Sequence, residues 1–342
     1  MSFIKNIKKI TGNEYADIVE DGIQANDISG YLDTGCYALN AVLSGSIYRG
    51  IANNKVTALA GDSSTGKTYI SLGIVKTFLD QHPHGECVYF ESESAITSDM
   101  IRNRKIDSSR MAMVGVTTVE EFRNQCVKVV DEYLKMPPDE REQKPLLLVL
   151  DSLGMLSTSK EMADTAEGKD VADMTRARVI KSVFRVLTLK LGKAGVPLLL
   201  TNHVYNSMSA YAPKVAGGGT GIQYAASTIV FLSKRKEKDG DEVVGNVLHA
   251  KINKGRQTKE NSQVDLLLRY DSGLNRYYGL LELAEKHGIF KKVSTRYEMA
   301  DGTKVFEKQI NEEPEKYFTI DILELIDKAA AKEFKYASDT DA

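Results

Sequence analysis

A glycine-rich segment at residues 61–68 constrains the fold of this chain more than any other feature. Its members, in order, are Gly61, Asp62, Ser63, Ser64, Thr65, Gly66, Lys67 and Thr68, which fit the pattern G-x-x-x-x-G-K-[ST]. An apolar, strand-like run at 56–60 precedes the segment, and a helix-like stretch follows from Tyr69. This strand–loop–helix order is the context that a phosphate-binding loop requires. The glycines let backbone N–H groups turn towards phosphate oxygens, and the start of the helix adds partial positive charge.

Two side chains at the end of this loop have defined tasks in such a site. Lys67 can reach the β- and γ-phosphates of a nucleotide, and Thr68 can place its hydroxyl on Mg²⁺. The alternative is a glycine-rich turn that binds nothing, and the flanking strand and helix disfavour it. The sequence therefore predicts that a nucleoside triphosphate and Mg²⁺ bind here.

Composition limits the class of protein. A chain of 342 residues with 27% charged and 42% hydrophobic residues is typical of a soluble globular protein. The formal net charge is -2, so any affinity for nucleic acid must come from local basic patches. The three cysteines, Cys36, Cys87 and Cys126, are too widely spaced for a disulfide framework or a zinc site. With no apolar run of membrane-spanning length and no secretory signal pattern, we expect a cytoplasmic protein that does not contact a membrane.

The middle of the chain alternates between strand-like and helix-like stretches. Strands are predicted at 56–60, 87–90, 111–114, 146–150, 196–200, 228–232, 246–252 and 264–269, and helices at 69–80, 119–135 and 171–192. The central strands are continuous apolar runs, as expected for parallel strands that are buried on both faces. The sequence therefore predicts an α/β fold with a mostly parallel central sheet, in which ligands bind at the carboxyl ends of the strands.

Acidic side chains follow two of these strands. Asp151 ends the apolar run 146–150, where a carboxylate can reach Mg²⁺ directly or through a water. Glu91 and Glu93 follow the strand at 87–90, and nucleotide hydrolysis needs a carboxylate that polarises the attacking water. Alternation along an extended chain places both glutamates on the same face, so their spacing does not choose between them.

A second group of polar residues could respond to the nucleotide. Thr201, Asn202 and His203 follow the predicted strand at 196–200, where a side chain could touch the γ-phosphate. A long stretch from Val204 leads from there to a glycine-rich run, and such stretches are usually mobile.

The predicted helix at 171–192 has an apolar face and a basic face. The apolar positions are Ala177, Ile180, Phe184, Leu187 and Leu191. Arg178, Lys181 and Arg185 line the basic face, with Arg176 nearby, and a polar stretch at 157–169 that we expect to be flexible precedes the helix. A basic helix face is ordinarily a solvated surface. Beside two flexible loops, it would suit a track for single-stranded nucleic acid.

The two ends of the chain differ from the middle. Residues 3–10 place four apolar side chains at helical spacing between lysines, which predicts a short amphipathic helix that packs on its own domain or on a neighbouring subunit. Beyond residue 275 we expect a helix ending near Gly288, a β-hairpin at 293–308 and a helix at 319–336. The predicted domains are an N-terminal helical segment with a linker at 1–30, a core at 31–275 and a small α+β region at 276–342.

The order of these motifs resembles the phage UvsX recombinases, a branch of the RecA family of strand-exchange ATPases. Besides the phosphate loop, the matching segments are Glu91-Ser92-Glu93, Leu147-Leu148-Val149-Leu150-Asp151-Ser152, Asp173-Met174-Thr175-Arg176-Ala177-Arg178, Thr201-Asn202-His203 and Gly217-Gly218-Gly219-Thr220-Gly221. The likeness runs from about residue 30 to about residue 290 and implies a RecA-like P-loop ATPase core.

The resemblance assigns roles that the residues alone leave open. It implies that Glu93 is the catalytic glutamate, and that His203 couples the γ-phosphate to the second DNA-binding loop. The two DNA-binding loops would be 157–170 and 204–221, which adds Gly217, Gly218, Gly219 and Thr220 to the basic residues Arg176, Arg178 and Lys181. Lys254 and Arg256 would reach the ATP of a neighbouring subunit, and Thr97 and Met100 would lie near adenine.

The function implied by the resemblance is ATP-dependent strand exchange. The partners would be single-stranded DNA, homologous double-stranded DNA and further copies of the chain in a helical filament, together with single-strand-binding and mediator proteins. The location would be the host cytoplasm. Two alternatives remain at this point: a RecA-like hexameric helicase, which we expect to carry an additional N-terminal domain, and a nucleotide-binding mediator that does not exchange strands.

Overall fold

The chain folds into two compact units, each built from separate stretches of sequence. The computed structural model describes residues 3–13, 15–169, 174–205, 215–217, 220–299 and 302–336. The first unit comprises Met1–Tyr31, Ala52–Ala58 and Phe78–Ala226, and the second comprises Leu32–Ile51, Leu59–Thr77 and Ser227–Ala342. The strand that leads into the glycine-rich loop begins in the first unit and ends in the second. These units cut across the predicted domains 1–30, 31–275 and 276–342, and that division stays a prediction.

The first unit contains a mainly parallel sheet. Its strands, in spatial order, are β3 (Val56–Gly61), β7 (Leu198–Tyr205), β6 (Leu146–Asp151), β4 (Glu86–Glu91) and β5 (Met111–Gly115). β4 runs parallel to both β5 and β6, and β6 runs parallel to β7. All six residues of β6 are buried, as the apolar run predicted for a central parallel strand. The short strand β8 (Val215–Ala216) pairs antiparallel with the end of β7.

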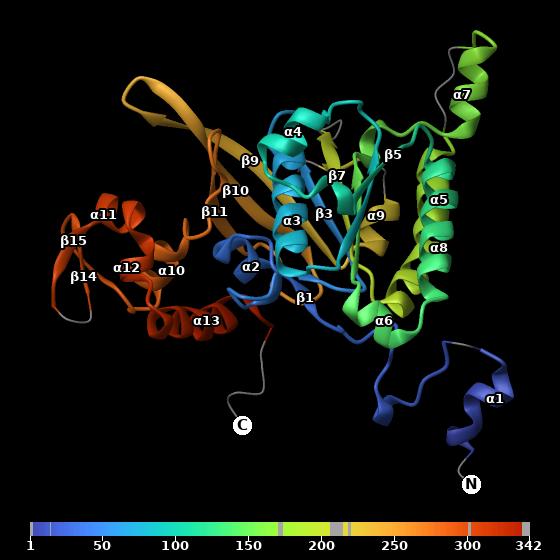
Figure 1. The fold of residues 1–342 in the computed structure, drawn as a ribbon, viewed down its shortest axis with the longest axis horizontal. Coiled ribbons are helices and arrows are strands. Elements are labelled where there is room, and N and C mark those ends of the chain that lie inside the picture. The colour runs from blue at the N-terminus through green and yellow to red at the C-terminus, as the bar shows by residue number, and fades with distance from the viewer. Residues whose placement is uncertain are drawn as a thin grey trace. The chain divides into compact units, whose positions relative to one another are not determined.

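Helices accompany this sheet. They are α1 (Ile7–Thr11), α4 (Ser98–Asn103), α5 (Val119–Leu134), α6 (Pro138–Gln143), α7 (Ser159–Ala166), α8 (Arg176–Ala194) and α9 (Thr220–Ala225), with 3₁₀ turns η1 (Ile4–Asn6), η2 (Val19–Asp21), η3 (Ser108–Arg110) and η4 (Leu153–Met155). α5 and α8 lie side by side (Figure 1). Each buries one stripe of apolar side chains, which on α8 includes Ile180, Phe184, Leu187 and Leu191. α9 approaches α8 closely because Gly221 has no side chain: a Cβ there would lie 2.9 Å from the backbone nitrogen of Lys181.

The second unit is built on antiparallel strands. Their order is β12 (Gly273–Leu274), β11 (Gln263–Arg269), β10 (Glu242–Gly255) and β9 (Thr228–Asp239). β9 and β10 extend as a hairpin beyond the last residue that pairs with β11 (Figure 1). A two-stranded sheet is formed by β1 (Tyr31–Leu32) and β2 (Ile51–Ala52).

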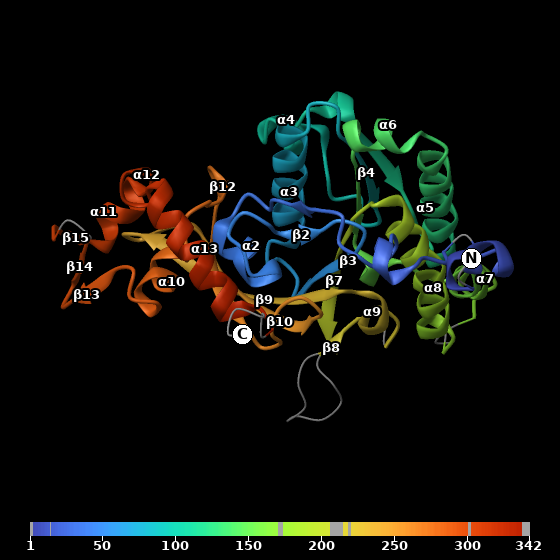
Figure 2. The same ribbon diagram turned by 90° about the horizontal axis from the view of Figure 1, so that it is seen from below.

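The helices of the second unit include one from each end of its sequence. They are α2 (Tyr37–Ser44), α10 (Leu280–Lys286), α11 (Glu307–Glu312), α12 (Pro314–Tyr317) and α13 (Ile320–Phe334), and α3 (Lys67–Gln81) starts in this unit and ends in the first. α13 packs against α2 (Figure 2). Asp327 of α13 strengthens this contact, because its carboxylate accepts hydrogen bonds from the Ser46 hydroxyl at 2.7 Å and the Ile47 N–H at 2.8 Å.

The predicted α/β fold with a mostly parallel sheet is confirmed, and three local predictions are wrong. The stretch at 157–169 contains helix α7 because Thr158 and Glu161 form a capping box. β7 runs on to Tyr205, so Thr201, Asn202 and His203 lie within the strand. Ala177 is exposed, because it lies in the first turn of α8, ahead of the buried stripe. The hairpin predicted at 293–308 is confirmed, since β14 (Arg296–Glu298) and β15 (Lys304–Phe306) pair antiparallel within it, and β13 (Lys291–Val293) adds a third strand beside β14.

Among the described residues, no helix combines the length and the apolar character that crossing a membrane requires.

The three buried thiols give a pH-dependent prediction. Burial raises the pKa of Cys36 to about 11 and that of Cys126 to about 12, and it also raises the pKa of Cys87. We expect a thiol reagent at pH 8 to label none of them in the folded chain and all three after unfolding in urea. Because unfolded thiols ionise from about pH 9 while the folded ones do not, the free energy of unfolding should fall as the pH rises from about 9 towards 11. Rapid labelling of the native chain would contradict this burial.

Candidate functional site

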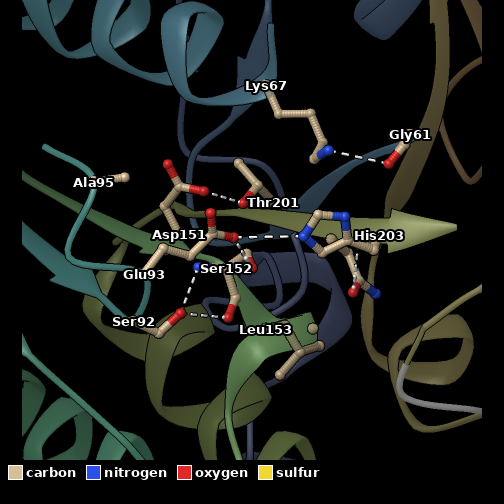
Figure 3. A network of polar contacts seen from close by, with 12 residues as sticks. Gly61, Lys67, Ser92, Glu93, Ala95, Asp151, Ser152, Leu153, Thr201 and His203 are labelled. Carbon is tan, nitrogen blue, oxygen red and sulfur yellow. Dashed lines mark hydrogen bonds and ion pairs between the residues drawn. The ribbon is translucent and has the colours of Figure 1, made fainter. Parts of the chain in front are cut away.

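The glycine-rich loop of the second unit closes around its own lysine. Lys67 is the first residue of α3, and its ammonium group donates hydrogen bonds to the carbonyl oxygens of Gly61 at 3.0 Å and Asp62 at 2.9 Å. The contact with Gly61 is drawn in Figure 3. Thr65 is buried and donates its hydroxyl hydrogen bond to the same Asp62 carbonyl at 2.9 Å. The lysine is only 7% exposed, so its charged ammonium group is shielded from solvent and lies against the loop.

Both glycines of the motif are required because neighbouring atoms lie too close to leave room for a side chain. Gly66 has φ +88°, and a Cβ on it would lie 2.7 Å from Leu268 Cδ2. A Cβ on Gly61 would lie 2.7 Å from the carbonyl oxygen of Leu232. The loop is therefore packed on the second unit's strands, and Lys234 of β9 adds a hydrogen bond to the Ser64 carbonyl at 2.5 Å.

The residues of this loop are suited to binding a nucleoside triphosphate with Mg²⁺. The side-chain-free glycines, the start of the 15-residue helix α3 and the Lys67 ammonium group together form a cradle for phosphate oxygens. Thr68 is half-buried beside them and can offer its hydroxyl to Mg²⁺. Within the described part of the chain, no group of three or more His, Cys, Asp or Glu side chains could hold a metal by itself. Mg²⁺ does not need one, since it binds through one or two oxygens of the protein plus phosphates and waters.

The first unit holds a separate acidic cluster at the ends of β4 and β6. Glu91 lies opposite Asp151 in the parallel register of these strands. Asp151 is 4% exposed; its Oδ2 accepts a hydrogen bond from the Tyr89 hydroxyl at 2.8 Å, and its Oδ1 accepts one from the Thr201 hydroxyl. Burial and the charge of Asp151 hold the pKa of Tyr89 well above its usual value, so the tyrosine remains a donor.

Two serines join these strand ends and position Glu93. The Ser92 N–H donates to the Asp151 carbonyl at 2.9 Å, and the Ser152 N–H donates to the Ser92 hydroxyl oxygen at 2.9 Å. The Ser152 hydroxyl then donates to Glu93 Oε1 at 2.7 Å (Figure 3). The same oxygen of Glu93 lies 3.4 Å from Nε2 of His203. Glu93 is thus held between a neutral donor and a histidine.

The contacts of Glu91 give it a different task. Its carboxylate accepts hydrogen bonds from the backbone N–H groups of Glu93 at 3.1 Å, Ser94 at 2.7 Å and Ala95 at 2.9 Å. The turn formed in this way contains Ser94 at φ +53°. Glu91 therefore organises the loop after β4, whereas the side chain of Glu93 is 32% exposed and available to a ligand.

Backbone and side-chain contacts link His203 to the glycine-rich run downstream. The Gly217 N–H donates to the His203 carbonyl at 2.8 Å, and the Asn202 side-chain amide donates to the Gly217 carbonyl at 2.6 Å. Asn202 is fully buried. η4 also passes close by, since a Cβ on Gly154 would lie 3.0 Å from Cδ2 of His203. A displacement of the backbone at His203 would therefore also displace Gly217.

The residues predicted to bind DNA fall into three groups. Arg178 and Lys181 are exposed on α8, and the Lys181 ammonium lies 5.1 Å from the centre of the Tyr224 ring. Arg176 is half-buried and donates to the carbonyls of η4 and Leu156 at 3.0–3.2 Å, so it braces the start of the 157–170 segment. Gly218 and Gly219 lie outside the described residues, as does the side chain of Thr220, whose backbone begins α9.

The predicted cations Lys254 and Arg256 lie at the end of β10 in the second unit. The pairing of β9 with β10 shifts by one residue between Ile252 and Lys254, which re-aims the strand. Burial, and then the nearby charge of Arg256, lowers the pKa of Lys254. The backbone N–H of Arg256 donates a hydrogen bond to the Ser227 carbonyl at 3.1 Å. Both cations thus lie at the same end of β10.

Thr97 and Met100 occupy the start of α4. The Thr97 hydroxyl caps this helix by accepting the Met100 N–H at 3.2 Å. Their predicted contact with adenine stays a prediction.

A family model that describes the RecA N-terminal domain matches residues 2–275 of the chain. The chain belongs to the RecA family. A recombination and repair protein of Enterobacteria phage T4 is 33% identical over 254 residues, which cover 74% of this chain and 63% of that protein. The RecA protein of Paracoccus denitrificans is 24% identical over 258 residues, covering 74% of this chain and 68% of the relative. The chain thus spans less than two thirds of the phage relative's length. The resemblance found in the sequence is confirmed at the level of the family.

Sequence reasoning missed the organisers of the acidic cluster. The sequence assigned no organising role to Tyr89, Ser92, Ser152 or Thr201, although the last three stand in the segments that carry the family resemblance. One pattern could have pointed to the serines: each directly follows an acid that ends a strand, in Glu91-Ser92 and in Asp151-Ser152. Neighbouring parallel strands bring such pairs to the same edge of a sheet.

The two glutamates should respond differently to loss of charge. Glu91→Gln weakens an acceptor of three backbone N–H groups, so we expect it to lower the free energy of unfolding by roughly 1–2 kcal/mol. Glu93→Gln can keep the Ser152 hydrogen bond through its amide oxygen and should cost under about 0.5 kcal/mol. Urea unfolding of the two single variants measures the difference. Equal losses would contradict the structural role assigned to Glu91.

Proposed function

We propose that this protein is an ATP-dependent recombinase that assembles as a helical filament on single-stranded DNA and pairs that strand with homologous double-stranded DNA. The observation that carries the proposal is the phosphate cradle around Gly61, Gly66 and Lys67 in a chain of the RecA family. The names of two relatives support it: one is called a recombination and repair protein, and the other is called RecA.

The chemistry proposed for hydrolysis gives each of the predicted site residues a task. Residues 61–68 would bind the phosphates of ATP, with Lys67 neutralising charge on the β- and γ-phosphates. Glu93 would polarise the attacking water, since its carboxylate is held by Ser152 and partly exposed. Bound Mg²⁺ would neutralise charge on the phosphates, and Thr68 and Asp151 are the residues proposed to hold it. The hydrogen bonds of Asp151 to Tyr89 and Thr201 support this role, because they fix a buried acceptor in one orientation.

His203 is proposed to report the nucleotide state to the DNA-binding loops. It contacts Glu93 on one side and is bonded through its backbone to Gly217 on the other. ATP binding would move Glu93 and His203 and so order the segment 204–221 around DNA. Arg178 and Lys181, with Gly217, Gly218, Gly219 and Thr220, are the proposed contacts to the DNA backbone, and Arg176 would hold the loop 157–170 in place. Such contacts are largely independent of sequence, which leaves the choice of partner strand to base pairing.

Lys254 and Arg256 are proposed to act on the ATP of a neighbouring subunit. There they would neutralise charge that develops in the transition state. A site completed by a second copy links ATP binding to assembly, so hydrolysis would release subunits from the filament. Thr97 and Met100 are proposed to contact adenine. Single-strand-binding and mediator proteins are proposed as further partners, and the host cytoplasm as the location.

The variants Glu91→Gln and Glu93→Gln also test the catalytic assignment. We expect Glu93→Gln to retain ATP and single-stranded DNA binding and to lose at least about 100-fold in DNA-dependent ATP turnover, because the attacking water is no longer polarised. Glu91→Gln, measured at a temperature where it is folded, should keep turnover within about three-fold. Steady-state ATPase assays with saturating DNA decide between them. Normal turnover in Glu93→Gln would transfer the role to Glu91.

A further inference from the structure

The segment that carries Lys254 and Arg256 is fixed by the C-terminal end of α13. The Lys259 N–H donates to the Phe334 carbonyl at 2.8 Å, and the Lys259 ammonium donates to the Glu333 carbonyl at 3.0 Å. These are carbonyls of the last helical turn, where a lysine satisfies free acceptors and interacts favourably with the helix dipole. A β-bridge between Thr258 and Lys335 continues the contact.

One side chain from beyond the helix reaches into this segment between the two cations. The Tyr336 hydroxyl donates a hydrogen bond to the carbonyl of Gly255 at 3.0 Å. Gly255 stands directly between Lys254 and Arg256 and must be glycine, because a Cβ there would lie 2.2 Å from the Thr258 carbonyl oxygen. The last residue of β10, between the two cations, is therefore packed closely against Thr258 and bonded to the hydroxyl of Tyr336.

The rest of the segment is fixed to the second unit's core. Thr258 is fully buried, and its hydroxyl donates to the carbonyl of Val42 in α2 at 2.8 Å. α13 is itself tied to the turn after α2 through Asp327. Helix α2, helix α13 and the segment 254–259 thus form one connected set of contacts within the second unit.

From these contacts we infer that Tyr336 is a positioning residue for ATP hydrolysis, which aims Lys254 and Arg256 at the nucleotide of a neighbouring subunit. The inference rests on the proposed role of these two cations. It gives a task to α13 and to the second residue after it, both of which lie outside the part of the chain that the RecA family model matches. The hydroxyl would act through the Gly255 peptide and would touch neither ATP nor DNA.

Subunit mixing tests the inference, because each proposed site combines the phosphate loop of one subunit with the two cations of another. Lys67→Ala subunits have an impaired loop and intact cations, and Arg256→Ala subunits have the reverse. An equal mixture on single-stranded DNA should regain ATPase activity at about one quarter of its interfaces, those that combine the two intact halves. Co-sedimentation of a tagged subunit with DNA shows that both variants enter the assembly.

Tyr336→Phe is then placed in one partner at a time. In the Lys67→Ala subunit, which supplies the working cations, it should lower the regained activity roughly three- to ten-fold. In the Arg256→Ala subunit, which supplies only the loop, it should change the activity by less than about 1.5-fold. The matched control is Tyr270→Phe in the Lys67→Ala subunit, which removes the hydroxyl of an exposed tyrosine of the same unit and should have no effect.

Each other outcome has a definite meaning. Equal losses from both placements would indicate general destabilisation and would overturn the positioning role while leaving the proposed function intact. No loss from either placement would overturn it as well. If the variants co-sediment and no activity returns in the starting mixture, the role of the cations in a neighbouring site fails, and the inference fails with it.

Discussion

The parallel pairing of β4 with β6 is the constraint on which the first unit's chemistry depends. It places Glu91 opposite Asp151 at one edge of the sheet, and the hydrogen bonds between Ser92 and Ser152 hold the two strand ends together. Because Asp151 is buried, each of its carboxylate oxygens needs a donor, and Tyr89 and Thr201 supply them from the strands on either side. A slip of register by one residue would move every one of these groups to the other face.

The second unit meets a different constraint, the close packing of backbone without side chains. Gly61 and Gly66 allow the phosphate loop to lie against Leu232 and Leu268, and Gly255 allows the close approach of the Thr258 carbonyl to the end of β10. Substitution at any of these glycines would require a shift of backbone or of a core side chain. The phosphate loop and the two cations therefore belong to the same unit. Helices α13 and α2 also contact each other in this unit.

Much of this could be predicted from the sequence, because its strongest patterns are local. The phosphate motif, the apolar run before Asp151 and the buried stripe of α8 each follow from spacing alone. Helix α7 was missed since its residues are polar, although the T-x-x-E pattern of Thr158 and Glu161 marks a helix start. Polar continuations also hid the true ends of β7 and β9, because hydrogen bonding to neighbouring strands, and not hydrophobicity, extends them.

Spacing alone left the choice between the two glutamates open, although the family resemblance implied Glu93, and it indicated no role for Tyr336. Both depend on contacts between residues that are far apart in the chain: Glu93 with Ser152, and Tyr336 with Gly255, 81 positions away. Spacing within one strand or helix contains no information about such pairs. They can be read only once the register of the strands and the path of α13 are known.

The proposed function requires that ATP binding at residues 61–68 drives assembly of this chain into a filament on DNA. Electron microscopy of the protein with single-stranded DNA and a slowly hydrolysed ATP analogue tests it most directly. We expect helical filaments for the wild-type chain, and none for Lys67→Ala or without nucleotide. Closed rings around DNA, or filaments that form equally well with Lys67→Ala, would contradict it.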